Sequence, residues 1–108
     1  MLAIRTAAFA AALSILSIVA HAEEVVHKLA IQVDENDPAV MNLALNNAQN
    51  VKEFYGAKGE KVTVEIVAYG PGLNMYVAGK SPVKDRISAM SLEGPEITFA
   101  ACENTHRE

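Results

Sequence analysis

The sequence predicts an α/β fold built on a mainly parallel sheet. Three short segments, residues 25–33, 62–69 and 97–101, are apolar or alternate in the manner of strands. Two segments with helical signals, residues 38–55 and 82–93, separate them. Strands that alternate with helices pair in parallel through right-handed crossovers, so helices are expected on both faces of the sheet, as three layers.

The first helix has the clearest boundary signals. Asp37 offers a side-chain acceptor for the N-cap, and Pro38 suits the first helical position because that amide has no intrahelical partner. The helix is expected to run to about Tyr55 and to end at Gly56. One apolar stripe recurs at three- and four-residue spacing and is predicted to pack on the sheet: Met41, Ala44, Leu45, Ala48, Val51 and Tyr55.

The other faces of this helix carry side-chain amides where Lys and Glu are more usual. The amides are Asn42, Asn46, Asn47, Gln49 and Asn50, and a second apolar set comprises Val40, Leu43 and Phe54. A neutral face in solvent would explain this composition. A face packed against another subunit would explain it too, since charged residues are depleted at the centre of interfaces.

A glycine-rich segment ends the second strand. Gly70, Pro71 and Gly72 allow the backbone to turn sharply across the strand end, which would bring residues 73–77 beside any site that the sheet builds. Ordinary loop packing is the alternative for those residues.

The second helix is expected to begin at Ser81-Pro82 by the same capping logic and to end by Gly94. Its buried face would be formed by Val83, Ile87 and Met90. The Ser-x-x-Lys pattern that starts at Ser81 also occurs in penicillin-interacting enzymes, but their other motifs are absent, so capping explains this serine better.

Cys102, the single cysteine, directly follows the third strand. The polar residues 103–105 indicate a strand-to-helix turn, and the start of a helix favours thiolate over thiol. Glu103 would oppose the thiolate, whereas His106 and Arg107 would support it. The alternative is a small buried hydrophobic residue without reactivity.

The position of Cys102 favours a functional role. If the strand order is 2-1-3, the first and third strands are neighbours, and the topological switch point lies between their carboxyl ends, where Cys102 sits. The same edge would carry the other candidate pocket residues, which are Asp34, Asn36, Tyr69, Gly70, Gly72, Glu103 and Asn104.

The first 22 residues have the features of a secretory signal peptide. Arg5 precedes the apolar run 6–19, and Ala20-His21-Ala22 is a small-x-small cleavage signature. Cleavage near Ala22/Glu23 would yield a periplasmic or secreted protein with one domain, residues 23–108. The run is short for a spanning helix, and no lipidation cysteine follows the cleavage site, so no membrane anchor is expected.

The net charge of the chain and its few potential metal ligands argue against several classes of function. Without Arg5, eight basic residues stand against 13 acidic ones, a net charge of −5 with no basic stripe, which argues against nucleic acid as a partner. Cys102 and His106, even with Glu103, do not complete a tetrahedral metal site. Neither a metal nor a cofactor is therefore expected.

Five stretches carry a resemblance to a known family: Lys28–Val33, Asn36–Pro38, Asn42–Ala48, Val64–Gly72 and Ala101–Thr105. Together they cover nearly all of the mature chain, and the Tyr-Gly-Pro-Gly and Ala-Cys-Glu-Asn-Thr segments are the strongest. On these residues the chain resembles the DsrE/DsrF-like family, whose members include sulfur-relay proteins.

The resemblance implies a flavodoxin-like fold, homo-oligomers such as trimers or hexamers, and a sulfur donor or acceptor protein as partner. Cys102 matches the position that carries sulfur as a persulfide, and Arg107 resembles the basic residue that follows it. Any activity would at most be that of a sulfurtransferase-like carrier. Family members continue beyond this point, so C-terminal elements would be missing. The alternative is an oligomeric small-ligand or protein-binding module with a structural cysteine.

Overall fold

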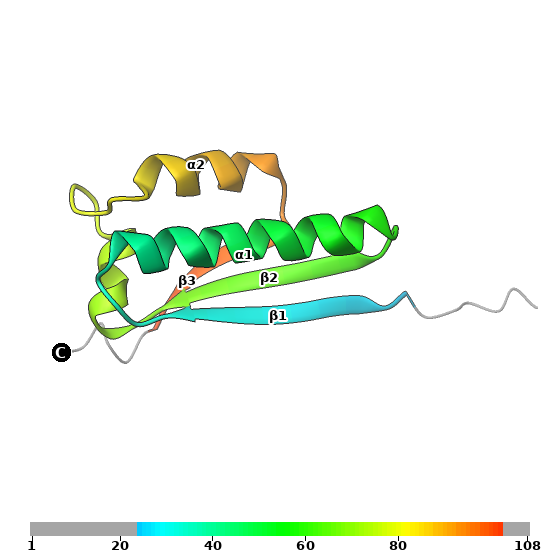
Figure 1. Ribbon diagram of the computed structural model, residues 1–108, viewed down its shortest axis with the longest axis horizontal. Helices are drawn as coiled ribbons and strands as arrows, with labels where there is room; N and C mark the ends of the chain where they lie inside the picture. Colours follow the sequence, from blue (N-terminus) through cyan, green and yellow to red (C-terminus); the bar gives the residue numbers. More distant parts are fainter. Residues whose placement is uncertain (1–23, 103–108) are drawn as a thin grey trace, which may run out of the picture.

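The computed structural model describes residues 24–102, which form a sheet layer and a helix layer (Figure 1). The elements in chain order are β1 (Val26–Val33), α1 (Pro38–Ala57), β2 (Lys61–Ala68), the 3₁₀ helix η1 (Gly70–Tyr76), α2 (Lys84–Glu93) and β3 (Ile97–Ala101). Both strand pairings are parallel. The predicted α/β class with a parallel, flavodoxin-like sheet is thereby confirmed.

The strand order is β1-β2-β3, so the predicted order 2-1-3 is wrong. Both crossovers step in the same direction across the sheet. Right-handed crossovers that step the same way place their helices on the same face. Figure 1 shows this arrangement, with α1 and α2 on one side of the sheet. The second helical layer that three layers require is not found within residues 24–102.

The sequence of the central strand, β2, alternates as expected for a strand that is buried on one face only. The side chains of β2 that face the helices are fully or almost fully buried, and they are Val62, Val64, Ile66 and Ala68. The intervening Lys61, Thr63 and Glu65 are exposed. A strand with helices on both faces is apolar throughout, so the alternation in β2 fits a sheet with one covered face.

Helix α1 begins as the sequence predicts. The Asp37 side chain accepts a hydrogen bond from the Ala39 amide at 2.8 Å, and Pro38 is the first helical residue. At the other end α1 continues to Ala57, and the Lys58 amide donates to the Tyr55 carbonyl at 3.0 Å. The predicted end at Gly56 is therefore short by one residue.

The predicted apolar stripe of α1 is confirmed as the main contribution of that helix to the core. Met41, Leu45 and Ala48 are fully buried and Ala44 nearly so, while Val51 and Tyr55 pack against them at the margin. The sheet and η1 supply the other fully buried large side chains, which are Val33, Val64, Ile66 and Met75. The core thus lies between the helices and one face of the sheet.

Three of the α1 amides contact α2. Arg86 of α2 donates to the side-chain oxygens of Asn42, at 3.0 Å, and of Asn46. One turn further on, the Gln49 amide donates to the Glu93 carboxylate at 2.9 Å. These three amides therefore join two helices of the same chain, although Asn46 is also exposed to solvent.

The second helix begins two residues later than predicted, at Lys84. Ser81 does accept a hydrogen bond from the Val83 amide, at 3.3 Å, but it closes a turn before the helix. Val83 occupies the N-cap position without a side-chain cap. The predicted buried face is confirmed, with Val83 and Met90 buried and Ile87 packed at the core margin.

Candidate functional site

Cys102 lies at the carboxyl edge of the sheet, in the position that directly follows β3. Its amide donates to the Ala68 carbonyl at 2.9 Å, so the backbone pairing of β2 and β3 extends one residue beyond β3. The residue is half-buried and the thiol is free. The backbone is thus fixed by the sheet while part of the residue remains accessible.

The loop after β2 crosses tightly over the end of β1. The Tyr69 amide donates to the Val33 carbonyl at 3.1 Å, and the Gly72 amide returns to the Tyr69 carbonyl at 3.1 Å. A Cβ at Gly72 would lie 2.1 Å from the Val33 carbonyl oxygen, so only glycine fits there. Gly70 has φ +54°, a backbone conformation that also favours glycine. Both glycines have local backbone roles.

Polar side chains from the loops after β1 and β2 meet at this edge. The Tyr69 hydroxyl lies 3.5 Å from the Asp34 carboxylate, and the Asn74 amide donates to the Asn36 side chain at 2.9 Å. Asn74 also reaches the Lys80 carbonyl at 3.5 Å. Sequence reasoning did not single out Asn74, because its partner Asn36 lies 38 residues away and no local motif marks the pair.

The strand order changes how Cys102 relates to the other candidate residues. Because β2 lies between β1 and β3, Asp34 and Cys102 follow strands about 10 Å apart, two strand spacings. Tyr69 follows the strand between them and contacts the Asp34 side. The expected switch point between adjacent first and third strands does not exist in the described sheet. The polar edge is instead organised around the end of β2.

The candidates Glu103, Asn104 and Arg107 lie outside the described residues, as does His106. The predicted helix after Cys102 lies there too. Among residues 24–102, no group of three or more His, Cys, Asp or Glu side chains could hold a metal ion. Over the same range, none of the helices has the length and apolar character needed to cross a membrane.

The residues after Gly72 pack inward. Met75 is buried in the core, and the Tyr76 hydroxyl donates to the Ile66 carbonyl at 2.7 Å. The Tyr76 ring meets Phe99 of β3 edge to face, with ring centres 6.1 Å apart. Burial raises the pKa of Tyr76 well above its ordinary value, and the Glu65 carboxylate adds to this, whereas the Ala100 backbone opposes it. Loop packing therefore explains Met75 and Tyr76.

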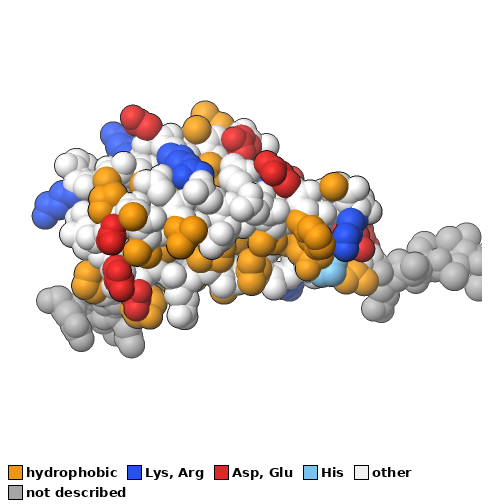
Figure 2. Space-filling view, in the orientation of Figure 1, with side chains coloured by type: hydrophobic (Ala, Val, Ile, Leu, Met, Phe, Trp, Pro, Cys, Tyr) orange, Lys and Arg blue, Asp and Glu red, His pale blue; other side chains and the backbone are white. Residues whose placement is uncertain are grey.

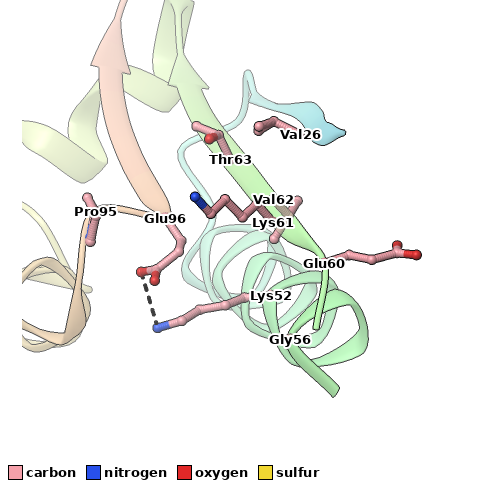
Figure 3. Close-up of a pocket in the computed structure, with 9 residues that line it drawn as sticks. All are labelled: Val26, Lys52, Gly56, Glu60, Lys61, Val62, Thr63, Pro95 and Glu96. Atoms are coloured by element: carbon pink, nitrogen blue, oxygen red, sulfur yellow. Dashed lines mark ion pairs between the residues drawn. The ribbon is translucent and has the colours of Figure 1, made fainter. Parts of the chain in front are cut away.

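A cavity of about 550 Å³ lies at the opposite, amino end of the sheet. Figure 3 shows Lys52 and Glu96 pointing toward each other across it, and their charged atoms are 3.8 Å apart. Its lining residues are Val26, Lys52, Gly56, Glu60, Lys61, Val62, Thr63, Pro95 and Glu96, none of them a candidate site residue. Ligands of open parallel sheets bind at the carboxyl ends of the strands, so this cavity does not argue for the Cys102 site.

Comparison with known proteins bears on the fold alone. No family model matches the chain, and no curated protein matches it. A solved structure similar to this chain is the protein of unknown function MTH1491 from Methanobacterium thermoautotrophicum, with a TM-score of 0.60 and 28% sequence identity. The match covers 75% of this chain and 67% of that one. The likeness supports the α/β architecture.

Proposed function

We propose that the protein is an exported sulfur carrier that holds sulfur as a persulfide on Cys102. The observation that carries the proposal is the placement of a free, half-buried cysteine directly after a strand of a parallel sheet. Ligand and reaction sites of α/β proteins concentrate at this edge. The resemblance to sulfur-relay proteins supplies the chemistry, and Cys102 stands at the matching position.

The loading step is a thiol exchange without net oxidation. The Cys102 thiolate attacks the terminal sulfur of a donor persulfide, R–S–SH. The bond between the two donor sulfurs breaks as the new bond to Cys102 forms, and the donor leaves as the thiol R–SH. Transfer onward repeats the step, with Cys102 as the leaving thiolate.

Residues that the family resemblance and the carboxyl edge of the sheet supply would assist this exchange by charge and shape. The resemblance assigns Arg107 the role of the basic residue, which would favour the thiolate and the bound persulfide anion because a cation near the sulfur lowers the free energy of its negative form. Asp34, Asn36 and Tyr69 would shape the edge where a donor or acceptor protein docks.

The proposal places the protein outside the cytoplasm, because residues 1–22 have the features of a signal peptide. A sulfur donor and a sulfur acceptor are its expected partners. The resemblance also supports a homo-oligomer, a trimer or a hexamer. No metal or cofactor takes part in the exchange chemistry.

Intact mass spectrometry tests the loading step. The purified protein and its Cys102→Ser variant are incubated with glutathione persulfide, and their masses are compared before and after treatment with a reductant. We expect a gain of one sulfur atom that the reductant removes and that the variant lacks. A folded protein that gains no sulfur, or a variant that gains as much, would contradict the proposal.

The second candidate is a non-catalytic binding module in which Cys102 is structural. Two observations favour this alternative. The Cys102 amide pairs with β2 as part of the β2–β3 ladder, and the residue is half-buried. Under it, Cys102→Ser would lower the free energy of unfolding and would leave ligand or partner binding intact. Under the carrier proposal, the same variant would lose all sulfur loading.

A further inference from the structure

The backbone pairing of the sheet is interrupted beside the cavity of about 550 Å³ at its amino end. The pairing of β2 with β3 begins at Val64 and Ile97, and the Val64 amide donates to the Glu96 carbonyl at 2.7 Å. Backbone direction alternates along a strand, so Val62 turns its amide and carbonyl to the same side as Val64. No described strand lies opposite Val62 on that side. Since Val62 lines the cavity, unpaired backbone groups lie at the cavity wall.

Lys52 and Glu96 point toward each other across this cavity, as Figure 3 shows, but no hydrogen bond joins them. The Lys52 ammonium lies 3.8 Å from the Glu96 carboxylate and 3.7 Å from the Glu93 carboxylate. Both distances exceed the limit of about 3.2 Å for such a bond, so these carboxylates use none of the three ammonium donors. One oxygen of Glu96 is buried without a hydrogen-bond partner among residues 24–102. The pair therefore has hydrogen-bonding capacity to offer a ligand.

The other walls of the cavity are largely apolar. Val26, Val62 and Pro95 contribute hydrocarbon surface, and Gly56 contributes no side chain. Figure 2 shows charged and apolar side chains close together at the end of the molecule where β1 begins. Small-molecule sites have volumes of roughly 300–1,000 Å³ and combine apolar walls with a few polar groups. The amino-end cavity has both properties.

The charges that line the cavity are balanced. Lys52 and Lys61 stand against Glu60 and Glu96. Glu60 and Lys61 each form a closer ion pair, at 2.8 Å, with a residue outside the lining, whereas Lys52 and Glu96 have only the longer contacts. A ligand with a single charge would meet one attractive and one repulsive charge at this pair. A ligand with a cation and an anion close together would meet two attractive ones.

We propose that the amino-end cavity binds a free α-amino acid with an apolar side chain. The ligand carboxylate would accept hydrogen bonds from the Lys52 ammonium. The ligand ammonium would donate to the Glu96 carboxylate and to the unpaired Val62 carbonyl, and its side chain would contact the apolar walls. Both charged groups of an α-amino acid are attached to one carbon, which suits a lysine and a glutamate whose charged atoms are 3.8 Å apart. The proposal does not depend on the role of Cys102.

An NMR titration of the purified, isotope-labelled protein with L-valine, L-leucine and L-phenylalanine tests the proposal. With at least one of the three, at up to about 20 mM, we expect saturable shifts of the backbone amide signals that line the cavity. Those signals belong to Lys52, Val62, Thr63 and Glu96. The amide signal of Cys102, at the opposite end of the sheet, should not move. If none of the three amino acids causes a saturable shift at the cavity, the proposal is overturned.

Analogues of the best-binding amino acid test which charges are recognised. Its amide lacks the carboxylate, and its N-acetyl derivative lacks the ammonium. Each should bind about tenfold more weakly or worse, because a charge-assisted hydrogen bond is lost and a charge of the cavity is left without its partner. Glycine should also bind more weakly, since it has no side chain for the apolar walls. Equal affinity for the amino acid, its amide and its N-acetyl derivative would overturn the proposal.

Charge-removing variants test the assigned residues. Lys52→Met and Glu96→Gln each remove one charge from the cavity, and each should raise the dissociation constant about tenfold or more. Lys58→Met and Glu53→Gln make the same changes at exposed positions outside the lining and should leave the dissociation constant unchanged. Circular dichroism shows which variants are folded, and if Glu96→Gln unfolds, Lys52→Met carries the test. Binding that persists unchanged in the folded cavity variants would overturn the proposal.

Discussion

The two ends of the sheet are held together by different physical means. At the amino end, polar and charged side chains bridge the elements: His27 and Glu60 lie 2.8 Å apart, and Lys52 lies 3.7 Å from Glu93 and 3.8 Å from Glu96. At the carboxyl end, backbone hydrogen bonds and a close glycine contact hold the loops. At the amino end, side-chain contacts on the surface thus add to the backbone hydrogen bonds, whereas at the carboxyl end the close approach of Gly72 to Val33 fixes the position of the loop.

That difference favours the carboxyl end as the functional edge. A reactive group needs a support whose position does not vary, and Cys102 is anchored through the β2–β3 ladder. The amino end has a cavity of about 550 Å³, but each of its charged lining residues already has an ion-pair partner: Lys52 pairs with Glu96, Glu60 with His27 and Lys61 with Glu24. Exposed ion pairs of this kind contribute at most about 1 kcal/mol each, because water and salt screen them.

The largest effect of any single substitution is expected at Gly72. In Gly72→Ala the new Cβ would meet the backbone of Val33 at 2.1 Å, which forces the loop away from β1. We expect a loss of about 3 kcal/mol or more in the free energy of unfolding, measured by urea denaturation. Gly70→Ala is the control, because nothing lies within 4 Å of its added Cβ and only its φ of +54° is strained. A cost for Gly72→Ala no greater than for Gly70→Ala would refute the close contact.

A smaller effect is expected at Tyr76. Tyr76→Phe removes the hydroxyl that donates to the Ile66 carbonyl, which should cost about 1 kcal/mol at neutral pH. Burial raises the pKa of Tyr76 above its ordinary 10.0, so the unfolded chain loses this proton first. The free energy of unfolding should therefore fall as the pH rises above about 10.

The matched measurement is the same pH series on Tyr76→Phe. The decline above pH 10 should be shallower in this variant, because its folded and unfolded states no longer differ at this position. Equal slopes in the two proteins would show that Tyr76 does not contribute to alkaline unfolding.

The smallest effect is expected at the amino end. Lys52→Met removes both ion pairs while keeping the length of the side chain, and should change the free energy of unfolding by no more than about 0.5 kcal/mol. The change should vanish in about 1 M salt, where the Debye length is roughly 3 Å. A loss of free energy of unfolding as large as that of Gly72→Ala would contradict the proposed difference between the two ends of the sheet.

Local sequence signals predicted the elements well because short-range physics sets them. Two predictions depend only on residues close together in the sequence, namely the cap at Asp37 and Pro38 and the apolar stripe of α1. Both are confirmed. The start of α2 was misplaced because Ser81 can cap a turn as readily as a helix. The three strands were correct to within one residue at each end.

The strand order could not be read in the same way, because local periodicity does not say which strands are neighbours. One signal was present in the alternation of β2, where Lys61, Thr63 and Glu65 interrupt the apolar residues. A strand buried on both faces would not tolerate such an alternation. This alternation predicts a sheet with helices on one face only.

The location of the candidate residues was predicted in part, and their role in a site stays a prediction. The sequence placed Asp34, Tyr69 and Cys102 at the carboxyl edge correctly, because strand direction fixes which end each residue follows. It did not predict the distance between Asp34 and Cys102, which depends on the strand order. The link between Asn36 and Asn74 was also missed, since it depends on how two loops meet in space.

The most direct test of the carrier claim is transfer of sulfur away from Cys102. A carrier must release what it accepts, so protein loaded with one sulfur atom is freed of donor and mixed with an excess of a small thiol. We expect the intact mass to return to that of the unloaded protein while the thiol becomes a persulfide, with no disulfide left on Cys102. Sulfur that stays on the protein under these conditions would contradict the account and would mark Cys102 as a site of modification instead of a relay.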